Sequence, residues 1–262
     1  CLDQLACNFN EEANSDDGSC DYSCHDIGNY SLNFDGINDW IAIELDDGFH
    51  LGADEFTISG WFMLNSYELQ RQNIIGTNPT SFGINFNHNP NNLGRLSYWL
   101  DSSGSNGWDL IHSGSGNKTD WEINKWYFLS VVKNETNLTV YIDEEIDFEY
   151  VGESSPLLVD ISLASYDLGS NEWFNGGFDY LSIWNKALSL DEIEEIKYND
   201  IIENTDDLLV WYKFNAGSES VLYDHSGNQN HGTIYGATWV ENIYGCLDQL
   251  ACNFNEEANS DD

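Results

Sequence analysis

Positive charge is scarce in this chain. Its 262 residues include eight Lys and Arg against 46 Asp and Glu, and the formal net charge is −38. A field of this sign repels nucleic acids and anionic membranes, so we expect neither as a partner. Part of the acidic surface serves solubility alone, and cations are the expected partners of the carboxylates that cluster beside Asn and Gly.

Long apolar stretches are also missing. No segment approaches the run of about eighteen apolar residues that a membrane-spanning helix requires, so no span is predicted. Cysteine is absent from residues 29–245. This body is nevertheless long enough to bury one large core, because sandwiches and barrels often run to roughly 250 residues as a single domain.

Four of the six Cys lie in residues 1–24, and the other two lie in a second copy of the start of this segment. Residues 1–17, CLDQLACNFNEEANSDD, recur without a change as residues 246–262. The simplest interpretation is a longer polypeptide that repeats every 245 residues, with this chain covering one period and the start of the next. We therefore expect a Cys-rich linker motif at 1–28, a body at 29–245 and the start of the next linker motif at 246–262.

The Cys-rich motif predicts disulfides and hence a secreted or cell-surface protein. Its four Cys are Cys1, Cys7, Cys20 and Cys24. So short a segment, with few apolar residues, needs covalent staples in place of a core. Zinc is the alternative, but the C-x5-C-x12-C-x3-C spacing departs from paired C-x2-C knuckles, and the intervening Asp and Asn suit harder cations. The residues alone allow three pairings, and Cys246 and Cys252 are expected to pair beyond residue 262.

Short apolar and aromatic runs separated by Gly, Asn and Asp fill the body and are typical of an antiparallel β-sandwich. The expected strands include residues 56–64, 126–133, 138–143, 178–184 and 208–214. Strict alternation in the last run predicts one face made of Leu208, Val210, Tyr212 and Phe214, and an opposite face made of Leu209, Trp211 and Lys213.

One helix is expected, at residues 189–198. Ser189 and Glu192 are spaced as a capping box, and Ile193 and Ile196 supply a short apolar stripe. A single helix of this length serves as a connector or a lid on the sandwich and does not form a layer.

Five separated motifs in the body resemble the successive signatures of laminin G-like (concanavalin A-like) jelly-roll domains. They read NFDGINDWIAI, FTISGWF, KWYFLSVVKNETNLTVYIDEE, FDYLSIWNKALSLDEI and WYKFNAGSESVLYDHSGNQNHGTIYGATW, and together they cover nearly all of residues 30–239. The resemblance implies an all-β fold: a two-sheet antiparallel jelly-roll sandwich with one short helix, preceded by the disulfide-stapled motif. Relatives usually place the last block before the first. In a tandem array this reflects either where counting starts or a real permutation.

The first 24 residues resemble a second family, the short C-x-D-x-x-A-x-N-x-N-x-x-A-x-x-D-D-G-S-C repeats of secreted bacterial surface proteins, which are similar to thrombospondin type 3 calcium loops. Two-cysteine members keep the equivalents of Cys1 and Cys20, so the resemblance implies the pairs Cys1–Cys20 and Cys7–Cys24. It also implies calcium ligands in the motif, namely Asp3, Asn8, Asn10, Asp16 and Asp17.

Two turns of the body are candidates for further calcium sites. Residues 34–39 and 224–232 carry carboxylate, amide and carbonyl oxygens around glycines, and such loops can surround a hard ion. Turn formation alone also favours Asp, Asn and Gly. Both motifs match places where related sandwiches hold calcium, and the resemblance implies the ligands Asp35, Asp39, Asp224, Asn228 and Asn230.

Catalysis is not expected. Glu145, Asp147 and Glu149 reproduce the E-x-D-x-E strand of laminarinase-type glucanases, in which alternate carboxylates share one face. The triplet follows LTVYIDE, however, a hairpin that reads YVDG in the binding-only relatives, and the Trp-Pro-Gly approach to a catalytic strand is missing. No Ser, His and Asp set indicates nucleophilic hydrolysis.

Aromatic side chains offer a possible sugar surface. Most of the ten Trp and fourteen Tyr are expected in the core, including Trp61, Trp126, Trp184 and Trp211. The candidates for a sugar platform lie near Gly, Ser and Asn in expected loops and are Trp99, Trp108, Trp121 and Trp173.

The leading hypothesis is an extracellular structural or adhesive protein, in which calcium-stabilised sandwiches and stapled linkers form a long fibre or surface stalk. Further copies of the repeat are then its partners, because reach and avidity grow with each copy. The alternative is a lectin-like module that binds polysaccharide, and a β-glucanase is the third possibility.

Overall fold

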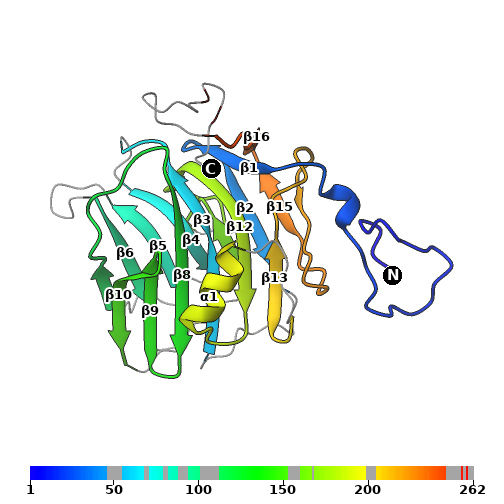
Figure 1. Ribbon diagram of the computed structural model, residues 1–262, viewed down its shortest axis with the longest axis horizontal. Coiled ribbons are helices and arrows are strands. Elements are labelled where there is room, and N and C mark those ends of the chain that lie inside the picture. The colour runs from blue at the N-terminus through cyan, green and yellow to red at the C-terminus, as the bar shows by residue number, and fades with distance from the viewer. Residues whose placement is uncertain are drawn as a thin grey trace.

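A computed structural model describes residues 1–45, 55–67, 71–78, 82–87, 94–100, 112–152, 160–166, 168–198, 205–245, 255 and 258. Two antiparallel sheets pack face to face, and the Cys-rich motif projects from one end of the sandwich (Figure 1). The all-β sandwich with one short helix is therefore confirmed. No helix among these residues is long and apolar enough to cross a membrane.

Sheet A has the strand order β10-β9-β8-β3-β12-β1-β16, and β13 also pairs with β12. Its strands are β1 (Tyr30–Asp35), β3 (Glu55–Leu64), β8 (Trp126–Asn134), β9 (Asn137–Ile142), β10 (Glu145–Val151), β12 (Asn175–Trp184), β13 (Leu208–Tyr212) and β16 (Thr238–Glu241). All five strands expected from the sequence lie in this sheet. Strands β1 and β13 pair with successive parts of β12.

Sheet B has the strand order β14-β15-β2-β11-β4-β5-β6-β7. Its strands are β2 (Trp40–Glu44), β4 (Arg71–Asn78), β5 (Phe82–Asn87), β6 (Arg95–Leu100), β7 (His112–Ser115), β11 (Asp160–Leu163), β14 (Val221–Leu222) and β15 (Gly232–Tyr235). The core lies between the two sheets and is rich in Phe, Ile and Leu side chains that alternate inward along the strands.

The last sequence block completes both sheets of the same body. Its first strand, β13, pairs with β12 in sheet A, and its third strand, β15, pairs with β2 in sheet B. The block therefore packs in one sandwich with the FDG motif, although it follows that motif in the chain.

The alternation predicted for β13 is wrong at its start. Ile183 pairs with Val210 and Trp184 pairs with Leu208, so Leu209 is an extra residue in a β-bulge. Beyond the bulge Val210 and Tyr212 face the main core as expected. The inserted residue exchanges the two faces of the strand for the residues before it. Leu208 therefore lies on the outer face with Trp211, and Leu209 lies in the core.

The helix α1 (Leu190–Tyr198) covers the outer face of sheet A (Figure 1). Its capping box is confirmed, because the Glu192 carboxylate accepts the backbone N–H of Ser189 at 2.8 Å and the Glu192 N–H donates to the Ser189 hydroxyl at 3.3 Å. Ile193 and Ile196 are buried against Trp184 and Trp211. The expected apolar stripe thus fixes the helix to the sheet.

Candidate functional site

Two disulfides shape the Cys-rich motif, which contains the short 3-10 helix η1 (Ser23–His25). Cys1 bonds to Cys20 with the two Cα atoms 4.8 Å apart, and Cys7 bonds to Cys24 with the Cα atoms 5.9 Å apart. The pairing implied by the second resemblance is confirmed. Cys246 and Cys252 lie outside the described residues, so their pairing beyond this chain stays a prediction.

The motif packs against the end of the sandwich through an apolar contact. Cys1, Ala6 and Tyr22 form one buried cluster with Ala216 and Tyr223 of the body. On the same contact, the His25 ring stacks on Tyr223 with ring centroids 3.6 Å apart and planes 10° apart. The motif is therefore docked on the sandwich that follows it in the chain.

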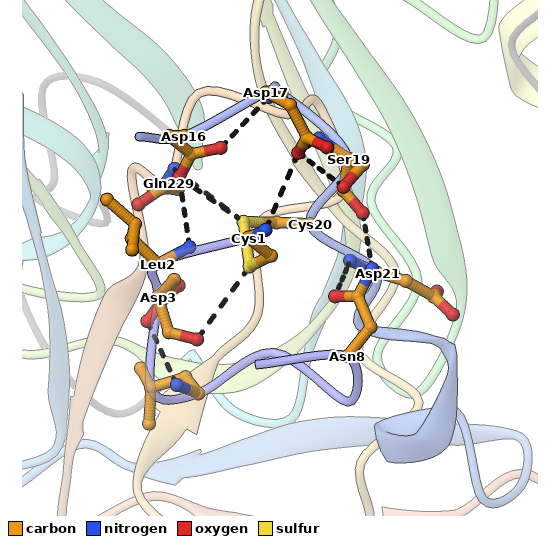
Figure 2. Close-up of a disulfide and its surroundings, with 12 residues drawn as sticks. Cys1, Leu2, Asp3, Asn8, Asp16, Asp17, Ser19, Cys20, Asp21 and Gln229 are labelled. Atoms are coloured by element: carbon orange, nitrogen blue, oxygen red, sulfur yellow. Dashed lines mark hydrogen bonds and ion pairs between the residues drawn. A yellow bond between two sulfur atoms is a disulfide. The ribbon is translucent and has the colours of Figure 1, made fainter. Parts of the chain in front are cut away.

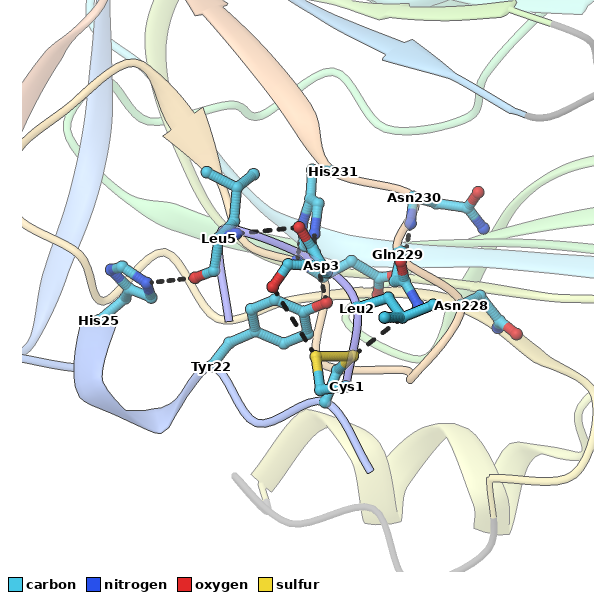
Figure 3. Close-up of polar contacts among 12 residues, drawn as sticks. Cys1, Leu2, Asp3, Leu5, Tyr22, His25, Asn228, Gln229, Asn230 and His231 are labelled. Atoms are coloured by element: carbon cyan, nitrogen blue, oxygen red, sulfur yellow. Dashed lines mark hydrogen bonds and ion pairs between the residues drawn. A yellow bond between two sulfur atoms is a disulfide. The ribbon is translucent and has the colours of Figure 1, made fainter. Parts of the chain in front are cut away.

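Asp3 is the polar centre of this docking contact (Figure 3). Its carboxylate accepts the Tyr22 hydroxyl at 2.6 Å and the backbone N–H of Leu5 at 2.9 Å, and it lies 2.7 Å from Nε2 of His231. Nδ1 of His231 accepts the backbone N–H of Asp224 at 2.9 Å, so the neutral ring carries its proton on Nε2 and donates it to Asp3. One histidine thus joins the motif to the sandwich.

A second polar contact surrounds Asp26. Its two carboxylate oxygens lie 3.0 Å from Nζ of Lys213 and 3.3 Å from Nε2 of His225. The neighbouring Ile27 N–H donates to the carbonyl of Asn215 at 3.1 Å. Charge pairs and a backbone hydrogen bond therefore extend the docking contact to the point where the motif meets the body.

The pKa values of both docking carboxyls predict an acid-sensitive contact. Burial acts to raise the pKa of Asp3 and of Asp26. For Asp3, hydrogen bonds from Tyr22, Leu5 and His231 outweigh burial and lower the pKa. For Asp26, hydrogen bonds and charge from His225 and Lys213 do the same. A carboxyl whose pKa is lowered by folding stabilises the contact fully above about pH 4 and loses this contribution as the pH falls further.

We therefore expect the motif to undock in acid before the sandwich unfolds. Pepsin digestion through the range below about pH 4 should cut within residues 1–28 while the body stays whole. Digestion of the motif at a constant rate across this range, or simultaneous loss of motif and body, would show that the two carboxyls do not hold the contact.

The calcium ligands expected in the motif do not converge. In Figure 2 Asp3 lies on the other side of the Cys1–Cys20 bridge from Asp16 and Asp17, and it faces His231. The Asn8 side chain bonds the Ser19 carbonyl and the Asp21 N–H, and the Asn10 side chain accepts the N–H of Glu12. Within the described ranges, the sets of three close metal-ligating atoms are built round the disulfides, whose sulfurs are not thiolates.

Asp16 and Asp17 are the candidates in the motif that keep exposed carboxylates. Asp16 accepts the N–H groups of Gly18 at 2.9 Å and Leu2 at 3.2 Å. Hydrogen bonds from Ser19 lower the pKa of Asp17 to about 2. Both groups are therefore ionised at neutral pH, as a cation ligand must be.

The loop after β14 does not fit a calcium ion. Asp224 is fully buried, and its carboxylate accepts four hydrogen bonds, from the N–H groups of Trp211, Ser226 and Asn230 and from the Ser226 hydroxyl. Asn228 and Asn230 both donate their amide groups to the carbonyl of Leu209. These carboxylate and amide groups are occupied by hydrogen bonds within the protein. The geometry therefore gives no support to the calcium ligation implied for this loop.

The turn between β1 and β2 fits a cation better. Asp39 is only 6 % exposed and accepts the N–H of Asp35 at 3.0 Å. Burial raises the pKa of Asp39. The hydrogen bond from the Asp35 N–H lowers this pKa, but the negative charge of the Asp35 carboxylate raises it further, and the net shift is upward. Two like charges thus come together here, and a bound cation would relieve their repulsion.

The carboxylates of β10 do not form a glucanase triplet. Glu145 pairs with Ile142 and Glu149 with Thr139, and a bulge at Asp147 separates them, so the two Glu lie on opposite faces. Asp147 is buried and accepts the Tyr98 hydroxyl at 2.5 Å and the Lys118 N–H at 2.6 Å. The one-face arrangement of the E-x-D-x-E pattern therefore does not form, because the bulge turns Asp147 inward to join β10 to β6.

The aromatic sugar candidates are mostly not exposed. Trp99 lies on β6 and not in a loop, and its buried ring covers Gly83 of β5. Trp121 belongs to the main core, with 8 % of its surface exposed. Both predictions of an accessible loop ring are therefore wrong. Trp173 is half-buried, and Trp108 lies outside the described residues. Among the Trp expected in the core, Trp184 and Trp211 are buried under α1, while Trp61 and Trp126 are partly buried.

Sequence reasoning missed the docking contact of the motif. His25, His225 and His231 all lie at it, as do Tyr22 and Tyr223. Half of the six His of the chain thus gather in one place. His25 lies in the Cys-rich motif, whereas His225 and His231 lie in the last sequence block, so no local pattern in the sequence marks the contact.

Comparison with known proteins supports the fold. A family model described as the concanavalin A-like lectin/glucanases superfamily matches residues 35–194. A candidate carbohydrate-binding protein from Bacteroides ovatus has a TM-score of 0.62 and 15 % identity over 81 % of this chain, which spans 60 % of that protein. The heptameric SAP-like pentraxin from Limulus polyphemus has a TM-score of 0.50 and 14 % identity, with 68 % of this chain and 86 % of the pentraxin covered. No curated protein matches the chain.

Proposed function

Because the chain belongs to the concanavalin A-like lectin/glucanase superfamily, whose sandwich also serves as a non-catalytic module, we propose that it is one repeat of an extracellular structural or adhesive array. The observation that carries the proposal is the docking of the Cys-rich motif on the sandwich that follows it. A motif held by an apolar cluster, two carboxylates and two disulfides is a rigid spacer, and a flexible linker would need none of these contacts.

Contacts at the end of the sandwich, just before the second copy of the motif, support the same proposal. Asn242, three residues before Gly245, donates its N–H to the Asn29 carbonyl and bonds the side chains of Ser31 and Asp179. Gly245 in turn packs against Asn255 of the second motif, since an added Cβ would lie 2.8 Å from the Asn255 Cβ.

One backbone hydrogen bond is common to the two copies of the motif. Ala258 N–H donates to the carbonyl of Asn255 at 3.2 Å, as Ala13 N–H donates to Asn10 at 3.1 Å in the first copy. In an array, each motif would then be docked on the sandwich that follows it. A short, packed connection would join the motif to the sandwich that precedes it. The two disulfides favour an oxidising, extracellular setting for such an array.

Calcium is part of the proposal at two places. The first place is Asp16 with Asp17, whose carboxylates are exposed and ionised. The second is Asp35 with Asp39, whose carboxylates repel each other. Bound calcium would supply positive charge to a chain of net charge −38, and so would favour the compact, straight form of the array.

Small-angle scattering from a chain of two consecutive repeats tests the array. We expect an elongated particle with a narrow range of shapes, because the motif adds no free hinge between sandwiches. A matched chain with a Gly-Ser insertion after Tyr244 should give a broader and shorter distribution. If the unaltered chain scatters like the one with the insertion, the repeats are not a rigid array; if chelation changes neither, calcium plays no part in its shape.

Polysaccharide binding is the second candidate function. The likeness to the candidate carbohydrate-binding protein from Bacteroides ovatus favours it, although an identity of 15 % supports the fold alone. Repetition along an array would turn weak binding by each sandwich into avidity. Retention of the 262-residue chain on immobilised polysaccharide tests this function separately from the array.

A further inference from the structure

The chain enters and leaves the sandwich at the same point. Strand β1 begins at Tyr30, just after the motif, and β16 ends at Glu241, which is the antiparallel partner of Tyr30 (Figure 1). Directly beyond this pair, the Asn242 N–H donates to the carbonyl of Asn29 at 2.9 Å. In an array, tension along the chain therefore pulls two neighbouring strands apart from one end.

An antiparallel pair resists this direction of pull poorly. Its hydrogen bonds lie perpendicular to the strands, so a force that separates the strands from one end loads the bonds one after another. In strand β16 the side chains of Thr238, Val240 and Glu241 are exposed, so little apolar burial adds to these bonds. The contacts at the exit of the chain therefore decide when the pair begins to open.

Asn242 provides these contacts through its side chain. Its Oδ1 accepts the Ser31 hydroxyl at 2.9 Å, and its Nδ2 donates to Oδ1 of Asn29 at 3.2 Å and to Oδ2 of Asp179 at 3.1 Å. Ser31 belongs to β1, and Asp179 belongs to β12 on the other side of β1. One residue thus ties the exit of the chain to two strands of sheet A.

The chain before β16 is held more firmly. Strand β15 ends at Tyr235 and pairs with β2, and its Ile234 is buried in the core. Separation that starts at Asn242 therefore stops at β15, after residues 236–245 have been released. This segment spans at most about 35 Å when it is fully extended.

We propose that Asn242 is a latch that carries tension between repeats, and that its release lets residues 236–245 extend while the core stays folded. The proposal rests on the array, since only a chain that continues on both sides of the sandwich is pulled at these two points. The exit opens before the entry, because β1 is paired on both sides and β16 on one side among the described strands. Each repeat then lengthens by a short, reversible step before its sandwich unfolds.

Optical tweezers with handles joined to short peptide tags at both ends of the 262-residue chain test the latch. At constant forces below that of global unfolding, we expect a reversible extension of about 35 Å or less. Asn242→Ala should raise the rate of this step about tenfold or more, because one of the lost hydrogen bonds is to a charged group. Asn242→Asp should also raise it, since it places a second negative charge beside Asp179.

Asn65→Ala is the matched control. Asn65 is half-buried like Asn242, and its Nδ2 donates to Oδ1 of Asn33 in β1 at 2.7 Å. Asn33 pairs with Thr238, however, at the end of β16 that separates last. We therefore expect the opening rate of Asn65→Ala to stay within about twofold of the unaltered chain, while the two Ala variants lose similar stability in urea.

Three results would each overturn the proposal. They are global unfolding without an earlier short step, an unchanged opening rate in Asn242→Ala, and an equal increase of the rate in Asn65→Ala. The pulled chain holds a single sandwich, so none of these results depends on whether consecutive repeats form a rigid array, which the scattering experiment tests.

Discussion

Replacing Asp224 by Ala will destabilise the sandwich by about 3 to 5 kcal/mol, the effect of removing a fully buried group from a satisfied network. Asp224 accepts hydrogen bonds from the backbone of Trp211 in β13 and of Asn230 before β15, and so joins the two sheets at the end that carries the motif. Without the carboxylate, these buried N–H groups lose their acceptor.

Urea unfolding followed by tryptophan fluorescence measures this effect. Asp35→Ala is the matched control, because Asp35 is exposed and caps the single N–H of Ile37, so we expect a loss of about 1 kcal/mol or less. Equal effects of the two substitutions would show that the Asp224 network adds nothing. If calcium at saturating concentration raised the stability of the unaltered chain but not of Asp224→Ala, the loop would hold calcium after all.

The second large effect concerns the Cys1–Cys20 bridge. Replacing both Cys by Ala should free the motif from the body, because the bridge closes a loop of 19 residues and also buries Cys1 in the docking cluster. Loop closure alone is worth about 3 kcal/mol for this length. The body has its own core, so its melting temperature should fall by only a few degrees.

The Cys7–Cys24 bridge provides a matched control. It spans 17 residues, so its loop-closure contribution is nearly equal, but Cys7 and Cys24 are exposed and lie outside the docking cluster. Limited proteolysis at neutral pH should therefore cut the motif faster in the variant without Cys1–Cys20 than in the variant without Cys7–Cys24. Identical rates would mean that the buried contact of Cys1 does not hold the motif.

The sandwich was predictable from the sequence because its signals are local. Apolar runs predicted five of the eight strands of sheet A, and the Ser189 and Glu192 pair predicted the start of α1. The errors fall on two bulges, at Leu209 and Asp147, where one inserted residue reverses the faces of a strand. No residue type marks either insertion in the sequence, so the prediction assumed strict alternation of the two strand faces across both bulges.

The candidate sites were harder to predict because their contacts join distant segments. Asp3 and His231 are 228 positions apart, and each alone is typical of a turn or a metal loop. Trp121 follows a polar stretch that indicates a loop, yet its ring contacts Phe62 and Tyr127 in the core. Asn242 and Asn29 likewise meet only because β16 pairs with β1.

The central claim is that the Cys-rich motif moves as one body with the sandwich that follows it. Backbone ¹⁵N relaxation of the 262-residue chain measures this directly. We predict that the amides of residues 3–24 have order parameters of about 0.85, like those of β3 and β12, and share their rotational correlation time. Order parameters below about 0.6 in the motif, or a separate correlation time for it, would contradict the account.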